Sequence, residues 1–169
     1  MKQSIWVHGT AARAEHVGGG GPSPAVAGHE MTTVDSKAWT DVVGLPSQNG
    51  MRFRGQSGKV NRLFVPLCVP LVIDDTMRAK VALLGIAFAT DVGVEIYKVS
   101  VGSGPDDLLF EWPRILAGNA LTGWVENLNY FRIDPPREVW GSLCIIFDVR
   151  FNREGNVTIA GVGCDLLFG

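Results

Sequence analysis

The stretch GSLCIIFDVRFNREGNVTIAGVGCDLLFG, residues 141–169, decides the fold class because two long runs of alternating apolar residues flank a short turn signal. Such alternation, rich in β-branched and aromatic residues, is typical of strands. We predict a β-hairpin with Arg153-Glu154-Gly155 as a three-residue loop and Gly155 in the left-handed conformation. In this register the core face of the first strand is lined by Leu143, Ile145, Phe147, Val149 and Phe151.

The opposite face of this hairpin is also apolar toward its open end. A contiguous apolar patch is seldom left in water, so either the N-terminal segment or a second subunit must cover it. We predict a homo-oligomer, joined most simply by a two-fold contact. The predicted interface consists of Cys144, Ile146, Val162, Cys164, Leu166 and Phe168. Cys144 and Cys164 are expected to be cross-strand neighbours, as packed thiols and not as a redox pair.

The chain upstream of this hairpin contains further short strands. The sequence RAKVALLGIAFATDVGVEIYKVSVG, residues 78–102, predicts a second hairpin around the loop Asp91-Val92-Gly93. No run of a dozen residues has a clear helical period. About eight to ten short strands separated by turn signals predict an all-β, antiparallel, jelly-roll-like β-sandwich, with a closed β-barrel as the alternative.

Length and composition favour an ordinary globular protein. The 169 residues fit one domain, residues 1–169, in which residues 18–50 form a Gly/Pro-rich segment that looks like an insertion. Hydrophobic residues make up 46% and charged residues 19% of the chain, which argues against overall disorder. A formal net charge of -2 gives no field that would hold a polyanion, so we expect no nucleic-acid partner.

Targeting signals and cysteine motifs are weak in this sequence. The apolar run Ile5-Trp6-Val7 is too short for a secretory signal, and no stretch approaches the roughly 18 apolar residues that span a membrane. We therefore expect a cytoplasmic protein without membrane contact. The three cysteines have no CxxC spacing, so neither a disulfide framework nor a zinc site is predicted.

Three segments together resemble a known family. They are IWVHG near the N-terminus, FVPLCVPLVIDD at residues 64–75, and VWGSLCIIFDVRF followed by AGVGCDLLF at the end. They resemble a family of small bacterial proteins described only as a domain of unknown function. The resemblance leaves residues 18–49 uncovered. Because the shared segments are strand-like, the resemblance implies a β-sandwich and gives no residue a catalytic role.

Candidate metal ligands are few, and we predict no metal site and no cofactor. His8 and His16 could approach each other around Gly9-Thr10, and Asp74 and Asp75 offer the hard oxygen donors that calcium prefers. The histidine spacing matches no metal motif, and aspartate is also a common turn residue. We therefore favour ordinary strand-end and turn roles for all four residues.

Candidate ligand-binding residues are three loop tryptophans, Trp39, Trp112 and Trp124, and one carboxylate, Asp165. Exposed aromatic rings on a sandwich can hold sugars, although core packing is favoured for any single ring. Trp6 and Trp140 lie in strands and are expected in the core or an interface. Asp165 falls on the core face of the predicted hairpin, so it needs a partner or a bulge that turns it outward. We favour a structural role for this carboxylate.

The absence of catalytic motifs leaves two functional hypotheses. No GxSxG, HExxH or phosphate-binding glycine pattern is present, and we assign no catalytic residue. The favoured hypothesis is a non-catalytic, self-associating binding or structural module. One form of it is a lectin-like module, with a carbohydrate or another small molecule as ligand. The alternative is a small-molecule enzyme of the cyclase, isomerase or hydrolase type. Such an enzyme would use a β-barrel or sandwich cavity, with Asp165, Tyr97 or a histidine as acid or base.

Overall fold

The computed structural model describes residues 1–14, 45–47, 49–70, 72–73, 77–103, 107–123, 125 and 128–169, and no α-helix occurs among them. One short 3-10 helix, η1 (Gly9–Ala11), interrupts the strands. The strands are β1 (Lys2–His8), β2 (Arg13–Ala14), β3 (Leu45–Ser47), β4 (Gly50–Gly55), β5 (Lys59–Leu67), β6 (Val72–Ile73), β7 (Met77–Thr90), β8 (Val94–Ser103), β9 (Asp107–Trp112), β10 (Asn119–Ala120), β11 (Tyr130–Glu138), β12 (Leu143–Phe151) and β13 (Gly155–Phe168).

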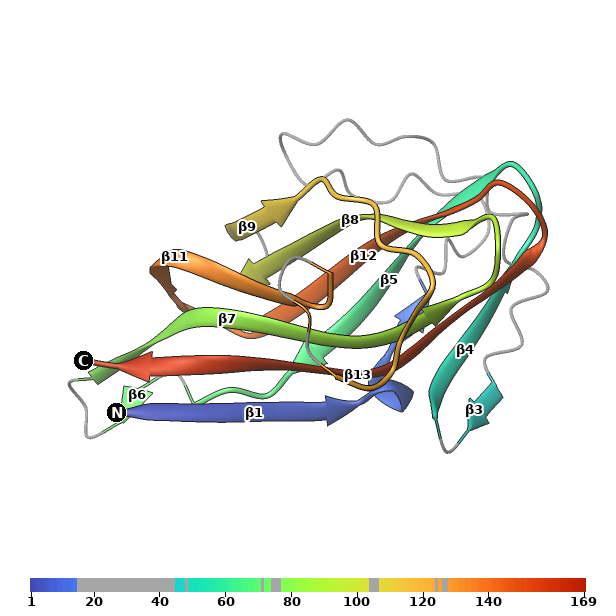
Figure 1. Ribbon diagram of the computed structural model, residues 1–169. Helices are drawn as coiled ribbons and strands as arrows, with labels where there is room; N and C mark the ends of the chain where they lie inside the picture. The colour runs from blue at the N-terminus through green and yellow to red at the C-terminus, as the bar shows by residue number, and fades with distance from the viewer. Residues whose placement is uncertain are drawn as a thin grey trace, which may run out of the picture.

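The strands form two antiparallel sheets that lie one over the other (Figure 1). Sheet A has the order β10-β7-β13-β4-β3, with β1 also on β13 and with β11 and β6 also on β7. Sheet B has the order β2-β5-β12-β8-β9. The row β4-β13-β7-β11 therefore faces the row β5-β12-β8-β9, which is the strand arrangement of a jelly roll. The predicted jelly-roll-like sandwich is confirmed, and the closed barrel is wrong.

The two predicted hairpins are wrong, although the first loop lies at residues 91–93 as expected and the second lies one residue before its predicted place. Strand β12 pairs with β5 and β8 in sheet B, whereas β13 pairs with β7, β4 and β1 in sheet A. Strands β7 and β8 are divided between the sheets in the same way. Each loop therefore connects a strand of one sheet to a strand of the other sheet, and we call such a connection an arch. Cys144 and Cys164 consequently lie in different sheets and are not cross-strand neighbours.

These two arches are joined by hydrogen bonds at one end of the sandwich, together with the β4–β5 connection (Figure 1). The Asn152 amide donates to the Gly93 carbonyl at 2.8 Å, and the Asp91 amide donates to the Asn156 carbonyl at 2.9 Å. The Asp91 carboxylate accepts the Asn156 amide at 2.9 Å. Gly93, the last residue of the loop at residues 91–93, has φ 85°, a left-handed conformation that favours glycine. The predicted left-handed conformation of Gly155 is wrong, because this glycine has no positive φ and is the first residue of β13; a Cβ there would lie 2.8 Å from Val94 Cγ2.

A β-bulge at Ala160 decides which face of β13 is buried. Ile159 lies opposite Phe88 and Gly161 opposite Ala87, so Ala160 is the extra residue. An extra residue reverses the inward and outward alternation that follows it. Val157 and Ile159 face the core before the bulge, and the buried residues after it are Val162, Cys164, Leu166 and Phe168.

Because of the bulge at Ala160, the predicted interface is wrong for its four residues on β13. Val162, Cys164, Leu166 and Phe168 are 0–4% exposed within one chain, so they belong to the core and cannot form an outer apolar face. Cys144 and Ile146 are half-buried on β12. The prediction for the other side of β12 is confirmed, because Leu143, Ile145, Phe147, Val149 and Phe151 are all 0% exposed. The homo-oligomer itself stays a prediction.

Candidate ligand-binding site on the outer face of sheet A

A second bulge opens sheet A near the chain termini. Along β7, Leu83 lies opposite Asp165 and Val81 lies opposite Leu166, which leaves Ala82 as an extra residue. On the other side of β7, Arg132 of β11 pairs with Leu83, but the next paired residue of β11 is Arg137. Residues 133–136 between them include two prolines, whose nitrogens cannot donate to the ladder. Strand β11 therefore departs from β7 beside the bulge.

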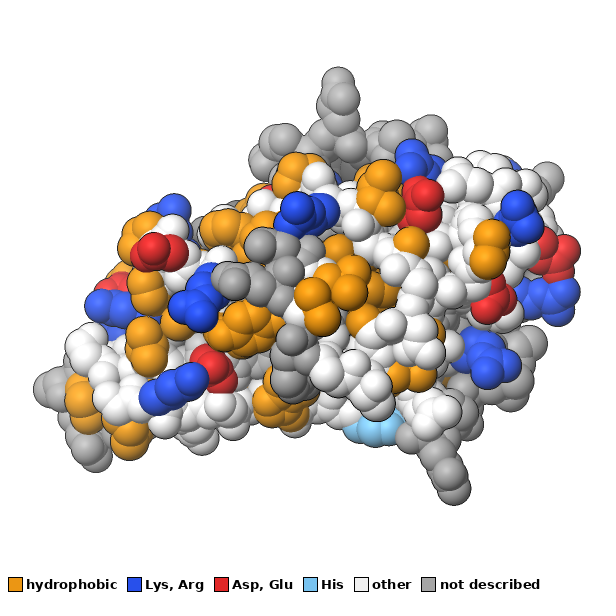
Figure 2. Space-filling view, viewed as in Figure 1, with side chains coloured by type: hydrophobic (Ala, Val, Ile, Leu, Met, Phe, Trp, Pro, Cys, Tyr) orange, Lys and Arg blue, Asp and Glu red, His pale blue; other side chains and the backbone are white. Residues whose placement is uncertain are grey.

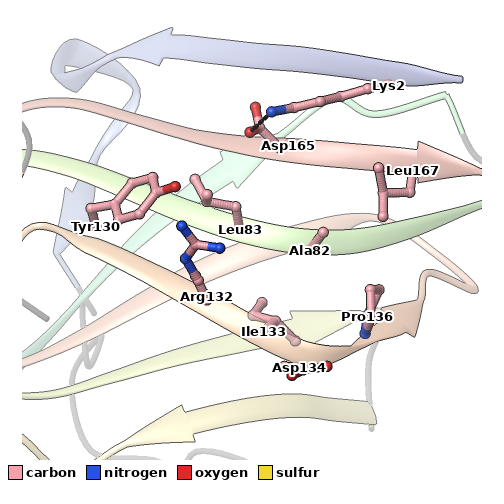
Figure 3. Close-up of a pocket in the computed structure, with 10 residues that line it drawn as sticks. All are labelled: Lys2, Ala82, Leu83, Tyr130, Arg132, Ile133, Asp134, Pro136, Asp165 and Leu167. Carbon is pink, nitrogen blue, oxygen red and sulfur yellow. Dashed lines mark ion pairs between the residues drawn. The ribbon is translucent and has the colours of Figure 1, made fainter. Parts of the chain in front are cut away.

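This departure creates a hollow of about 410 Å³ on the outer face of the sheet (Figure 3). Its lining comes from β1, β7, β11 and β13 and consists of Lys2, Ala82, Leu83, Tyr130, Arg132, Ile133, Asp134, Pro136, Asp165 and Leu167. Figure 2 shows basic, acidic and apolar side chains interleaved over this part of the molecule. The volume falls within the range of small-molecule sites.

Asp165 is held by two side chains of β1. Lys2 Nζ lies 2.8 Å from Asp165 Oδ2, and Ser4 Oγ donates to Asp165 Oδ1 at 2.5 Å. Burial would raise the pKa of Asp165, but the hydrogen bonds from Lys2 and Ser4 and the charge of Lys2 outweigh it and hold that pKa below its ordinary value of 3.8. The expectation that Asp165 needs a partner or a bulge is confirmed on both counts, because the Ala160 bulge also turns it onto the outer face.

Trp6 forms a flat apolar surface next to this ion pair. Trp6 pairs with Gly163, and a Cβ on Gly163 would lie 2.2 Å from Trp6 Cδ2 and 2.5 Å from Cε2. These two atoms share the central bond of the indole, so the ring covers the glycine. The Trp6 residue remains 46% exposed, so it does not lie in the core, and its expected place in an interface stays a prediction. In the sequence GVG at residues 161–163, two glycines share one face of the strand, which can indicate a close approach of an aromatic ring. We did not connect these glycines with Trp6.

Tyr130 and Arg132 lie on the far side of the hollow from β1. Tyr130 is opposite Gly85, which is itself opposite Gly163, so one cross-strand row runs Trp6, Gly163, Gly85, Tyr130. The Arg132 guanidinium carbon lies 6.0 Å from the centroid of the Tyr130 ring. Figure 3 shows the Tyr130 hydroxyl and the Arg132 guanidinium directed toward Leu83, whereas Asp134 lies at the opposite side of the site from Asp165.

Among the other predicted ligand-binding residues, Trp112 is used for packing. Its ring is half-buried, 3.9 Å from that of Phe110 and 5.1 Å from that of core residue Phe131 by ring centroids. Trp39 and Trp124 lie outside the described residues. Trp140, expected in the core or an interface, is 59% exposed, and the Arg78 guanidinium lies 4.1 Å from its ring centroid.

The predicted metal candidates are not brought together by the described part of the chain. His8 is exposed at the end of β1, whereas His16, Asp74 and Asp75 lie outside the described residues. Within the described ranges no three His, Cys, Asp or Glu side chains are grouped to hold a metal ion. Those ranges also contain no helix long and apolar enough to cross a membrane.

The outer face of sheet B carries a buried ion-pair cluster that the sequence analysis missed. Arg62 donates to Asp148 through Nε at 2.6 Å and through Nη2 at 3.1 Å, and Lys98 Nζ lies 3.2 Å from the same carboxylate. The Asp148 side chain is only 5% exposed. Tyr97 lies on β8 in this sheet, and burial raises its pKa above 10.0. The residues of the ion-pair cluster come from β5, β8 and β12, which are distant in sequence, so local patterns could not reveal the cluster.

Comparisons with protein-family models, with curated proteins and with solved structures find no match to this chain. The resemblance to the bacterial family of unknown function is therefore still a prediction. The candidate site rests on its own geometry.

Proposed function

We propose that this protein is a non-catalytic binding module that holds a carbohydrate on the outer face of sheet A. The observation that carries the proposal is the Trp6 ring, which covers Gly163 and lies beside a polar hollow. A sugar ring has an apolar face of C–H groups and a rim of hydroxyls. An exposed indole matches the apolar face, and a few fixed polar groups match the rim.

The polar groups of the hollow favour binding over acid–base catalysis. One carboxylate oxygen of Asp165 accepts a hydrogen bond from Ser4 and the other forms an ion pair with Lys2, and the pKa of Asp165 is lowered. A general acid or base works best when its pKa lies near the operating pH, which is the opposite direction of shift. Tyr97, the other side chain named for the enzyme hypothesis, belongs to sheet B and not to this hollow.

An array of immobilised glycans tests the proposal. The wild-type protein should bind at least one class of glycan, and Trp6→Ala should weaken that binding at least tenfold, as measured afterwards by calorimetric titration with the same glycan. Trp140→Ala is the matched control, because Trp140 is also exposed but lies outside the cross-strand row of Trp6, Gly163, Gly85 and Tyr130 that leads to the hollow. Folded wild-type protein that binds no glycan, or equal losses in the two variants, would contradict the proposal.

A further inference from the structure

The charged side chains around the hollow are unequally placed. Lys2 and Asp165 neutralise each other across 2.8 Å. Asp134 lies at the far side of β11 from this pair (Figure 3). The guanidinium of Arg132 is directed toward the hollow, on an exposed residue beside the Tyr130 ring. On the β11 side the hollow therefore presents a guanidinium and a neighbouring phenol hydroxyl to a ligand.

We propose that the ligand is an acidic oligosaccharide whose carboxylate binds Arg132 while a neighbouring sugar ring stacks on Trp6. This inference rests on the proposed function and specifies its ligand. Guanidinium and carboxylate form parallel, charge-assisted hydrogen bonds. A guanidinium has five N–H donors in a planar arrangement that matches a carboxylate. The Tyr130 hydroxyl can donate to the same carboxylate.

The separation of the two binding groups sets the length of the ligand. Trp6 is on β1 and Arg132 on β11, with β13 and β7 between them. The two backbones are three strand spacings of about 4.8 Å apart, but the Trp6 ring lies over Gly163 of β13 and the Arg132 guanidinium is directed toward Leu83 of β7, so the side chains are closer together than the backbones. An oligosaccharide of two or more sugar units can therefore extend from the indole to the guanidinium.

Calorimetric titration with defined sugars tests the inference. The probes are trisaccharides of galacturonate, mannuronate and glucuronate, each with its uncharged methyl ester, and the three monosaccharides. We expect at least one acidic trisaccharide to bind tenfold or more tightly than its ester and its monosaccharide, and to lose affinity as salt is added. Arg132→Gln should remove this preference and leave the affinity for the ester within about threefold.

Arg137→Gln is the matched control, since Arg137 is an exposed arginine of the same strand that does not line the hollow. It should leave both affinities within about threefold. If acid and ester bind equally, or if the array identifies only neutral glycans, the acidic ligand is wrong while the sugar-binding proposal stands. If no glycan binds at all, both proposals are wrong. If Arg132→Gln keeps the preference, Arg132 is not the carboxylate-binding group.

Discussion

Replacing Gly163 by alanine should disturb both the fold and the candidate site, because this glycine lies under Trp6. The added Cβ would lie 2.2 Å from Trp6 Cδ2 and 2.6 Å from the Ile5 carbonyl oxygen. The indole can rotate away, but the carbonyl belongs to the backbone of β1, so β1 must shift relative to β13. Overpacking of this kind costs about 1–3 kcal/mol.

The neighbouring glycine provides a matched control. Gly161 is two residues away on the same strand and also faces β1, but a Cβ there would meet only the Val7 carbonyl oxygen, at 3.5 Å. This is an ordinary van der Waals distance, and neither glycine has a positive φ. Gly161→Ala should therefore change the free energy of unfolding by no more than about 0.5 kcal/mol, in the range of a neutral surface substitution.

Urea denaturation followed by circular dichroism measures this difference. With a slope of about 2 kcal/mol per molar urea, a loss of about 2 kcal/mol lowers the midpoint of Gly163→Ala by about 1 M, while Gly161→Ala keeps the wild-type midpoint. The tryptophan emission of Gly163→Ala should also shift before unfolding, because Trp6 leaves its position. Equal midpoints for the two variants would refute the close contact of Trp6 and β1 with Gly163.

Three further predictions concern charges and thiols. The pKa of Asp165 is lowered in the folded protein, so its ionised form stabilises the fold at neutral pH, and this stabilisation is lost as the pH falls. The difference in unfolding free energy between wild type and Asp165→Asn should therefore shrink below about pH 4, and a pH-independent difference would argue against the Lys2 and Ser4 contacts. Burial raises the pKa of Cys164 to about 12, whereas Cys68 is exposed, so an aromatic disulfide reagent at pH 8 should label Cys68 rapidly and Cys164 only after denaturation. Rapid labelling of Cys164 in the folded Cys68→Ser variant would contradict the burial of Cys164. Asp148→Asn leaves two cations facing a neutral side chain and should lower the free energy of unfolding, measured by urea titration, by about 1.5–3 kcal/mol. Glu154→Gln, which loses only an exposed pair with Arg54, should lower it by less than about 1 kcal/mol, and similar losses in the two variants would refute the buried cluster.

Local sequence patterns were sufficient for the strands and for one face of the core. Alternation along residues 143–151 correctly identified the five buried side chains of β12, because neighbouring side chains of a strand point to opposite faces. The loop at residues 91–93 was also placed correctly, and the loop predicted at residues 153–155 lies one residue earlier, at residues 152–154. These features depend only on residues close together in the chain.

The same patterns failed where a loop or an extra residue changes the pairing. A short polar loop between two apolar strands suits a hairpin and an arch equally well, so the sequence could not show that β12 and β13 enter different sheets. The Ala160 bulge has no marked local signal, yet it reverses the alternation of β13. For this reason Cys164 and Leu166 were assigned to an outer face instead of the core.

The sequence by itself determined that this chain is an all-β protein with alternating, core-forming strands, because alternation and turn chemistry act over a few residues. Only the tertiary structure decided that Lys2, at one end of the chain, meets Asp165, at the other, and that Trp6 covers Gly163 beside them. Strands pair through backbone groups that are nearly the same in every residue. Partner and register are therefore selected by the packing of the whole sandwich, and the candidate site exists only once that packing is complete.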